Sequence, residues 1–318
     1  MRDVFAIAAL WIDERRRFAL ATVVDVRDAE PSPVGTTIAV DEDANVRGTI
    51  GGAGCNEAEI VEVCLKVVRD GQTRRLDINL ASEDEVIGGM ACGALMQLAV
   101  WRPSPEFANE ARAIASGTRA ARLRVEYDRG DGVPVAFEHV FEAKSKLVVV
   151  GATAVAAELA MLGRRLDFEV VVVDPRPSYA TKERIPDASE VVRAWPDDVL
   201  PDLLSERTPV VVLSHDPKVD LPALRCALNS DAPYVGLLGS RRSQSSRRAT
   251  LRDEGFDEAT LARVHGPVGL DLGGVTVAET ALSILAEIVA VRRGGDGVPL
   301  HEGDGTIHRR LERTGEPV

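Results

Sequence analysis

The first half of the chain carries its apolar residues in short runs, rich in β-branched side chains, that alternate with turn residues. The breaks contain closely spaced prolines with a glycine, or a run of acidic residues, and both compositions favour hairpins of antiparallel strands. Between 57 and 69 the apolar positions change to helical spacing, which places Cys64 on the packed face of a helix. We expect strands at 21–26, 36–40, 46–50, 75–80 and 95–101, then one short helix and a strand pair between 103 and 144.

The pattern changes at Lys146, where near-continuous apolar runs begin to alternate with amphipathic segments. Such runs indicate parallel strands buried on both faces, and the repeated βα alternation is typical of a doubly wound sheet. Thr276 and Glu279 have the spacing of a capping box, which predicts a last long helix that ends near Arg292. The other strands are expected at 146–150, 169–174, 210–214 and 234–238, and the helices between them at 154–165, 197–206, 221–229 and 243–254.

These patterns predict an α/β protein with two domains, because 318 residues can supply two hydrophobic cores. The first domain, 1–143, is expected to be a mixed α/β unit that ends in a linker. The second, 144–293, is expected to be a Rossmann-like doubly wound parallel sheet. Residues 294–318 are polar and rich in glycine, so we expect a disordered tail.

The charge and composition exclude several classes of function. A formal net charge of −12 and a pI near 5.0 argue against nucleic acid as the main partner, because a phosphate backbone favours a broad basic face. No apolar stretch reaches membrane-spanning length without a charge or a glycine, and the N-terminus lacks the layout of a signal peptide, so we expect a cytoplasmic protein. Four scattered cysteines without a CxxC pair predict neither a disulfide framework nor a zinc site.

Two glycine-rich loops in the first half each carry a cysteine. The first loop leads into a predicted helix, where free backbone N–H groups can bind an anion and the helix dipole lowers the pKa of the Cys55 thiol. If the two loops converge, their thiols could hold a soft metal or a sulfur species. Taken alone, either cysteine is more typical of a small buried residue. The candidate ligands are Gly51, Gly52, Gly54, Cys55, Glu57, Cys92 and Gly93, with Cys55 and Cys92 as the metal candidates.

Gly151 stands where a dinucleotide-binding fingerprint would begin, and Asp174 follows at the distance of a ribose-binding acid. Thr153 replaces the second glycine of that fingerprint, whose missing side chain normally lets the backbone approach a pyrophosphate. The pattern therefore supports a Rossmann-like fold better than nicotinamide binding. Gly151 is equally consistent with a tight turn, and Asp174 with a capping or turn residue.

A cluster of arginine and serine follows Gly239 in this otherwise acidic chain. Arginine forks, hydroxyl groups and a helix N-terminus all favour a phosphate or a carboxylate. We expect Ser240, Arg241 and Arg242 to face a site, and Arg247 and Arg248 to be surface charges. The remaining candidates at strand ends are His215, as a hydrogen-bond donor or proton shuttle, and Asp271, in the glycine-flanked segment before the last helix.

The order of these motifs resembles that of the XdhC/CoxI family, accessory factors for xanthine dehydrogenase and related molybdenum hydroxylases. The resemblance covers nearly the whole chain, although GATAVA at 151–156 departs from the glycine pattern usual in the family, as do Ala53 with Gly54 and Ala94. The motifs are PVG at 33–35, GTIGGAGCNE at 48–57, CG at 92–93, LSHD at 213–216, GLLGSRR at 236–242 and HGPVGLDLG at 265–273.

The resemblance implies a protein that binds molybdenum cofactor, protects it during sulfuration and helps to insert it into a hydroxylase apoenzyme. It also implies a homodimer and a cysteine desulfurase as a further partner. By similarity, the cofactor would lie between the domains, with its molybdenum near Cys55 and Cys92 and its phosphate near Ser240 and Arg241; Glu57 and His215 are carried over as contacts. Two alternatives remain open: an NAD(P)-dependent oxidoreductase, against which Thr153 speaks, and a noncatalytic adaptor that docks on a hydroxylase.

Overall fold

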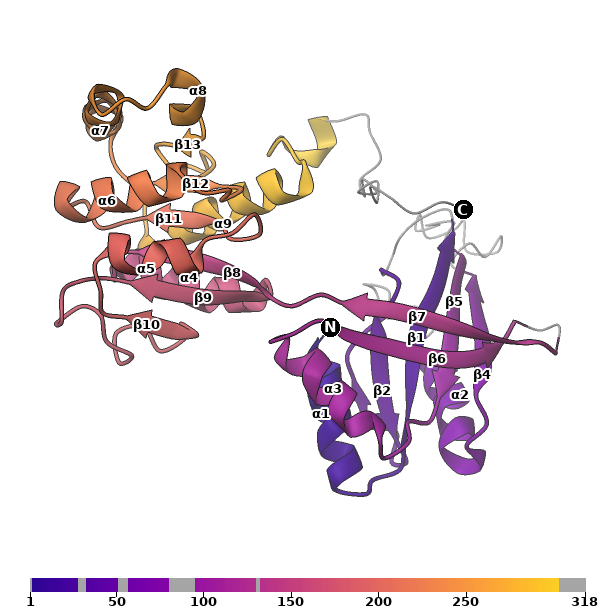
Figure 1. Ribbon diagram of the computed structural model, residues 1–318. Coiled ribbons are helices and arrows are strands. Elements are labelled where there is room, and N and C mark those ends of the chain that lie inside the picture. Colours follow the sequence, from indigo (N-terminus) through magenta and orange to yellow (C-terminus); the bar gives the residue numbers. More distant parts are fainter. Residues whose placement is uncertain (1, 28–32, 51–56, 80–94, 130–131, 303–318) are drawn as a thin grey trace. The chain divides into compact units, whose positions relative to one another are not determined.

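The computed structural model describes residues 2–27, 33–50, 57–79, 95–129 and 132–302 (Figure 1). The chain divides into two units, 1–143 and 144–318, and each has hydrophobic clusters of its own. Within the described residues, every helix is too short or too polar to cross a lipid bilayer.

The first unit is built on a five-stranded sheet in the order β3-β2-β1-β5-β4, in which all paired strands are antiparallel. This confirms the predicted hairpin pairing. The strands are β1 (Phe18–Arg27), β2 (Thr37–Asp41), β3 (Val46–Arg47), β4 (Arg74–Asn79) and β5 (Leu95–Trp101). The other elements are α1 (Arg2–Asp13), α2 (Glu57–Asp70), α3 (Phe107–Ser116) and a hairpin of β6 (Ala121–Asp128) and β7 (Pro134–Phe141).

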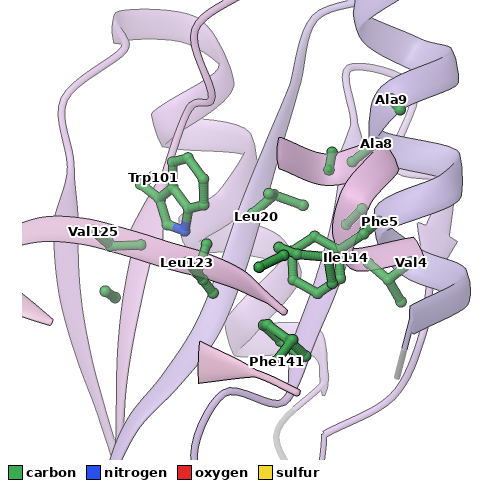
Figure 2. Close-up of a cluster of buried hydrophobic side chains, with 14 of the residues drawn as sticks. Val4, Phe5, Ala8, Ala9, Leu20, Trp101, Ile114, Leu123, Val125 and Phe141 are labelled. Carbon is green, nitrogen blue, oxygen red and sulfur yellow. The ribbon is translucent and has the colours of Figure 1, made fainter. Parts of the chain in front are cut away.

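The sheet of the first unit is buried on both faces. Ala21 and its neighbours on one face pack with α2, whereas Leu20 on the opposite face packs in the cluster of α1, α3 and β6. Figure 2 shows this second cluster, in which Phe5, Ile114 and Leu123 gather around Leu20. The segment after 103 therefore contributes to the core of the unit and is more than a linker.

The second unit contains a six-stranded parallel sheet in the order β10-β9-β8-β11-β12-β13. Numbered within the unit, this is the order 3-2-1-4-5-6 of a Rossmann fold, so the predicted doubly wound sheet is confirmed. The strands are β8 (Ser145–Val150), β9 (Phe168–Val173), β10 (Glu190–Val192), β11 (Val210–Val212), β12 (Val235–Leu237) and β13 (Val264–His265). The helices are α4 (Ala154–Arg165), α5 (Pro196–Leu203), α6 (Pro217–Leu228), α7 (Arg241–Asp253), α8 (Glu258–Leu261), α9 (Val277–Arg293) and the short 3-10 helix η2 (Leu300–Glu302).

Alternate residues of the buried strands supply two separate cores. Val149 packs on the side of α4 and α9, whereas Val148 packs on the side of α5 and α6. Helix α9 begins with the predicted capping box: the Thr276 hydroxyl accepts from the Glu279 N–H, and the Glu279 carboxylate accepts from the Thr276 N–H at 2.7 Å. The carboxyl ends of the parallel strands all lie at one edge of the sheet, and ligands of such sheets bind at that edge.

Candidate functional site

The turn after β8 lies at the point where the strand order reverses, between β8 and β11. Gly151 has φ +105°, and a Cβ built on it would stand 2.7 Å from the backbone nitrogen of Ser214. The turn therefore requires glycine both for its conformation and for its close approach to the end of β11. Thr153, where the fingerprint usually has its second glycine, caps α4 by accepting a hydrogen bond from the Ala156 N–H.

Asp174 follows β9 and is fully buried. Its carboxylate accepts from the Ala152 N–H at 2.7 Å and from the backbone and guanidinium of Arg176. Burial works against the charge, but these hydrogen bonds outweigh it and hold the pKa of Asp174 below its ordinary value. The carboxylate thus fastens the turn after β8 to the end of β9, and the Arg176 guanidinium in turn covers the Tyr179 ring.

The segment after β11 carries an exposed histidine in a strained backbone conformation. His215 has φ +62°, which is uncommon outside glycine, and its side chain is exposed. Ser214, just before it, is buried and donates its hydroxyl to Asp220 at 2.5 Å. Asp216 caps α6 by accepting from the Lys218 N–H at 2.9 Å. His215 is therefore presented at the end of β11 by residues whose own polar groups are satisfied.

The arginine-rich segment opens helix α7 immediately after β12. Gly239 has φ +138°, and Ser240 caps the helix by accepting from the Ser243 N–H. Arg241 and Arg242 occupy the first two positions of α7, and both are exposed. The first turn of α7 thus carries two exposed arginines at a helix N-terminus, where negative charge is favoured.

The prediction that Arg247 is a surface charge is wrong. Arg247 is 8% exposed and forms an ion pair with Asp220, which is fully buried. The physical reason is helical spacing, since Arg247 lies one turn before Leu251 on the face of α7 that packs into the core. Arg248 does lie on the surface, as predicted, and pairs there with Glu258 at 2.7 Å.

A network of polar side chains next to β13 has no counterpart in the sequence predictions. The Glu287 carboxylate accepts from the Tyr234 hydroxyl at 2.6 Å and from the Gly269 N–H at 2.7 Å, and it is 2.9 Å from His265 Nδ1. Burial opposes the charge of Glu287, but these bonds hold its pKa below the ordinary value, and burial beside Glu287 raises the pKa of Tyr234. The network fixes the segment that leads to Asp271, which is exposed and accepts from the Gly273 N–H at 3.3 Å.

In the first unit, Glu57 is the first residue of α2 and accepts a hydrogen bond from the Thr49 hydroxyl at 3.2 Å. Cys64 lies on the buried face of α2, as predicted, and burial raises the pKa of its thiol to about 12. Within the described ranges, no cluster of three or more metal-ligating side chains occurs. The other candidates of this unit lie outside the described residues: Gly51, Gly52, Gly54, Cys55, Cys92 and Gly93.

The structure thus places four candidates of the second unit at one edge of its sheet, whereas Asp271 lies further along the chain after β13. Gly151, Asp174, His215 and Ser240 follow β8, β9, β11 and β12 directly or within a few residues. Because the strands are parallel, their carboxyl ends lie at the same edge. The edge combines a tight glycine turn, an exposed imidazole and a basic helix N-terminus, which suits an anionic ligand.

Both units of the chain match models of known protein families. Residues 147–288 match the model of the XdhC Rossmann domain, and residues 11–79 match the model of the XdhC and CoxI family. The chain belongs to the XdhC and CoxI family. The two matches fall in different units of the chain. The Rossmann strand order of the second unit agrees with the match of that unit to the XdhC Rossmann domain.

Three curated relatives and one solved structure are similar to this XdhC and CoxI protein. Uncharacterized protein YqeB of Escherichia coli is 26% identical over 93% of this chain and 47% of the relative. A probable xanthine dehydrogenase subunit from Bacillus subtilis is 29% identical over 48% of this chain and 44% of the relative. Molybdenum cofactor insertion chaperone PaoD of Escherichia coli is 25% identical over 91% and 87%. The chain thus spans about half the length of the first two relatives.

The solved structure comes from Bacillus halodurans and is described as a xanthine dehydrogenase. Its TM-score to this chain is 0.74, with 20% sequence identity, and the match covers 91% of this chain and 96% of that one. At this level of identity the match shows that the two proteins share a fold.

Proposed function

We propose that this protein binds molybdenum cofactor as cargo, protects it, and helps its sulfuration and insertion into a molybdenum hydroxylase similar to xanthine dehydrogenase. The observation that carries the proposal is the match of both units to one family. The relative described as a molybdenum cofactor insertion chaperone supports it, because that alignment covers nearly all of both chains.

The chemistry of the second unit suits one end of this cargo. Molybdenum cofactor is a pterin dithiolene with a phosphate, sometimes extended by a nucleotide. The N-terminus of α7 offers the Ser240 hydroxyl, free N–H groups and the exposed guanidinium groups of Arg241 and Arg242, which together favour a phosphate. His215, exposed at the neighbouring strand end, adds a hydrogen-bond donor. These groups would bind and orient the phosphate end.

The thiol chemistry suits the other end of the cargo. We assign Cys55 and Cys92 to the molybdenum, because thiolates are soft ligands, and Glu57 at the start of α2 to the same end. Cys64 is unsuited to this role, since burial raises the pKa of its thiol to about 12. We also propose that the partners of this protein are a hydroxylase apoenzyme and a cysteine desulfurase. The same proposal includes a homodimer and a cytoplasmic location.

The test is retention of the cargo. Purified protein is mixed anaerobically with molybdenum cofactor and passed through gel filtration, and molybdenum and pterin are measured in the protein peak. We expect stoichiometric retention by the wild type and at least ~10-fold less by the Cys55→Ser, Cys92→Ser double variant. Cys226→Ser is the matched control, because this thiol lies in α6 and burial raises its pKa.

Two results would contradict the proposal. The first is that no cofactor remains on the wild type while a known carrier retains it under the same conditions. The second is that the double cysteine variant supports full maturation of a hydroxylase that it binds, which would favour an adaptor that holds no cofactor.

The strand order of the second unit favours one further candidate, an NAD(P)-dependent oxidoreductase. Two observations weigh against it. Thr153 occupies the place of the second fingerprint glycine, and the buried Asp174 carboxylate already accepts hydrogen bonds from Arg176 and from the Ala152 N–H. Calorimetric titration of the protein with NAD and NADP would decide, since absence of binding heat rejects this candidate.

A further inference from the structure

A cavity of about 310 Å³ lies in the second unit, on the side of the sheet covered by α6 and α7. Its volume falls at the lower end of the range for small-molecule sites. Residues of α7 and α8, of the ends of β12 and β13, and of the segment after β13 line it, so its walls come from several parts of the unit. This cavity is distinct from the exposed first residues of α7 that the proposed function uses, although Arg241 borders both.

Three arginines of α7 line the cavity: Arg241, Arg247 and Arg248. Arg248 is exposed and paired with Glu258, whereas the Arg241 guanidinium has no partner in the described part of the chain. Asp220 pairs with Arg247, and Glu258 pairs with both Arg248 and Arg252. Positive charge therefore exceeds negative charge around the cavity, which favours an anion.

Arg247 supplies an independent sign of a ligand. Its side chain is 9% exposed, and Nη2 pairs with Asp220. Its Nε, by contrast, is buried and has no hydrogen-bond partner among the described residues. A buried N–H without an acceptor is destabilising and is rare in folded proteins, so an acceptor from outside the chain accounts for it. The cavity that Arg247 lines is where that acceptor can enter.

The remaining wall residues are mostly apolar, and Gln244 and Ser245 of α7 are the polar exceptions. Leu237, Leu251, Val264 and Pro267 line the cavity together with the arginines. Leu237 and Leu251 are already buried in the core, whereas Val264 and Pro267 keep exposed surface. A bare inorganic anion would leave Val264 and Pro267 exposed, whereas an organic group attached to the anion would cover them. Arginine forks match the geometry of a phosphate oxygen pair. These features specify a ligand with a phosphate at one end and a small apolar or planar group at the other.

We propose that this cavity binds a small organic phosphate monoester, whose phosphate contacts Arg241 and Arg247 and whose organic part lies on Val264 and Pro267. Asp220 connects the site to the sheet edge, because its second oxygen accepts from the Ser214 hydroxyl and Ser214 abuts Gly151. The site lies wholly within the second unit and shares Arg241 with the proposed cargo site, whereas Arg247 belongs to the cavity alone.

The experiment is calorimetric titration of the full chain, free of molybdenum cofactor, with phenyl phosphate, inorganic phosphate and benzoate. Phenyl phosphate should bind ~10-fold more tightly than inorganic phosphate, because its ring buries the apolar wall. Benzoate, with the ring but a planar carboxylate, should bind more weakly than phenyl phosphate. Absence of binding by millimolar phenyl phosphate, or equal affinity for benzoate, would overturn the proposal.

Variants of α7 test whether the ligand binds in the cavity. Arg241→Gln removes an exposed charge without disturbing a core contact and should weaken phenyl phosphate binding ~10-fold or more. Arg247→Lys keeps a cation beside Asp220 but removes the buried Nε, and should weaken it similarly. Arg252→Gln is the control, because Arg252 is exposed on the same helix, pairs with Glu258 and does not line the cavity.

The comparison of variants is decisive in either direction. Wild-type affinity in Arg241→Gln would show that Arg241 does not contact the phosphate. Equal losses in Arg241→Gln and Arg252→Gln would show that the phosphate responds only to the general charge of α7. Cofactor retention, measured separately, distinguishes the two proposals, since Arg247→Lys should lose phenyl phosphate binding while it still retains molybdenum cofactor.

Discussion

At the turn after β8, Gly151 combines two requirements that a side chain would violate. Its φ is +105°, and its Cβ would stand 2.7 Å from the Ser214 nitrogen. We expect Gly151→Ala to lower the free energy of unfolding by ~2–4 kcal/mol, because backbone strain and a backbone clash add. Gly255→Ala is the control, since Gly255 has φ +99° but open space around its Cβ, and it should cost about 1 kcal/mol. Urea unfolding measures both, and equal losses would show that the clash is relieved.

Asp220 and Arg247 form an ion pair deep in the second unit, and removing one partner leaves the other charge buried. We expect Asp220→Asn to lower the free energy of unfolding by ~3–5 kcal/mol. Arg247→Met in the same chain should recover part of that loss, because it removes the stranded charge. Urea unfolding of the single and double variants measures the coupling, and purely additive losses would contradict it.

The sequence predicts the positions of some single residues and misses others, because only local patterns can be seen in it. Ser240 and Arg241 are predictable at a helix start because they follow an apolar run, and that signal is local. The burial of Arg247 escapes the prediction, although its spacing from Leu251 carries the information. The contact of Tyr234 and His265 with Glu287 joins residues far apart in the chain, so no local pattern reveals it.

Among the elements, α9 has the most complete sequence signal for its start. The Thr276 hydroxyl and the Glu279 carboxylate each satisfy a backbone N–H of the other residue. We expect Thr276→Ala to lower the free energy of unfolding by about 1 kcal/mol, because one N–H of the first turn loses its acceptor. Thr276→Ser keeps the hydroxyl and should be close to the wild type in the same urea experiment. A loss as large in Thr276→Ser would mean that the methyl group matters more than the cap.

The elements that the sequence predicts are those with many residues of one period. Strands β8 and β9 are long apolar runs, and α2 and α4 have clear helical spacing, so each matches its expected range closely. Strands β10 and β13 span three and two residues, which is too short for a period to appear. Helix α1 is absent from the predicted elements, although Val4, Phe5, Ala8 and Ala9 have the spacing of a buried helical face.

At the scale of the whole second unit, Asp174 is one of the carboxylates that make stability fall in acid. Its pKa is lower in the folded state than the ordinary 3.8, so the folded chain holds this proton less readily than the unfolded chain. The stabilisation is therefore complete well above pH 3.8 and is lost as the pH falls below that value through the folded pKa. We expect Asp174→Asn to cost about 2 kcal/mol near neutral pH and to flatten the fall of stability in acid. Urea unfolding across this pH range measures both, and a wild-type slope in the variant would contradict the assignment.

The division of the molecule into units leads to a last prediction. Each unit has hydrophobic clusters drawn from its own residues on both faces of its sheet, and the sheet of the second unit runs unbroken from β10 to β13. A fragment of residues 144–318 should therefore fold alone and unfold in one cooperative transition, because its core does not need the first unit. Circular dichroism during urea unfolding measures this, and Gly151→Ala should destabilise the fragment as much as the full chain. A gradual transition with strong binding of a hydrophobic dye would show that the first unit completes the fold of the second.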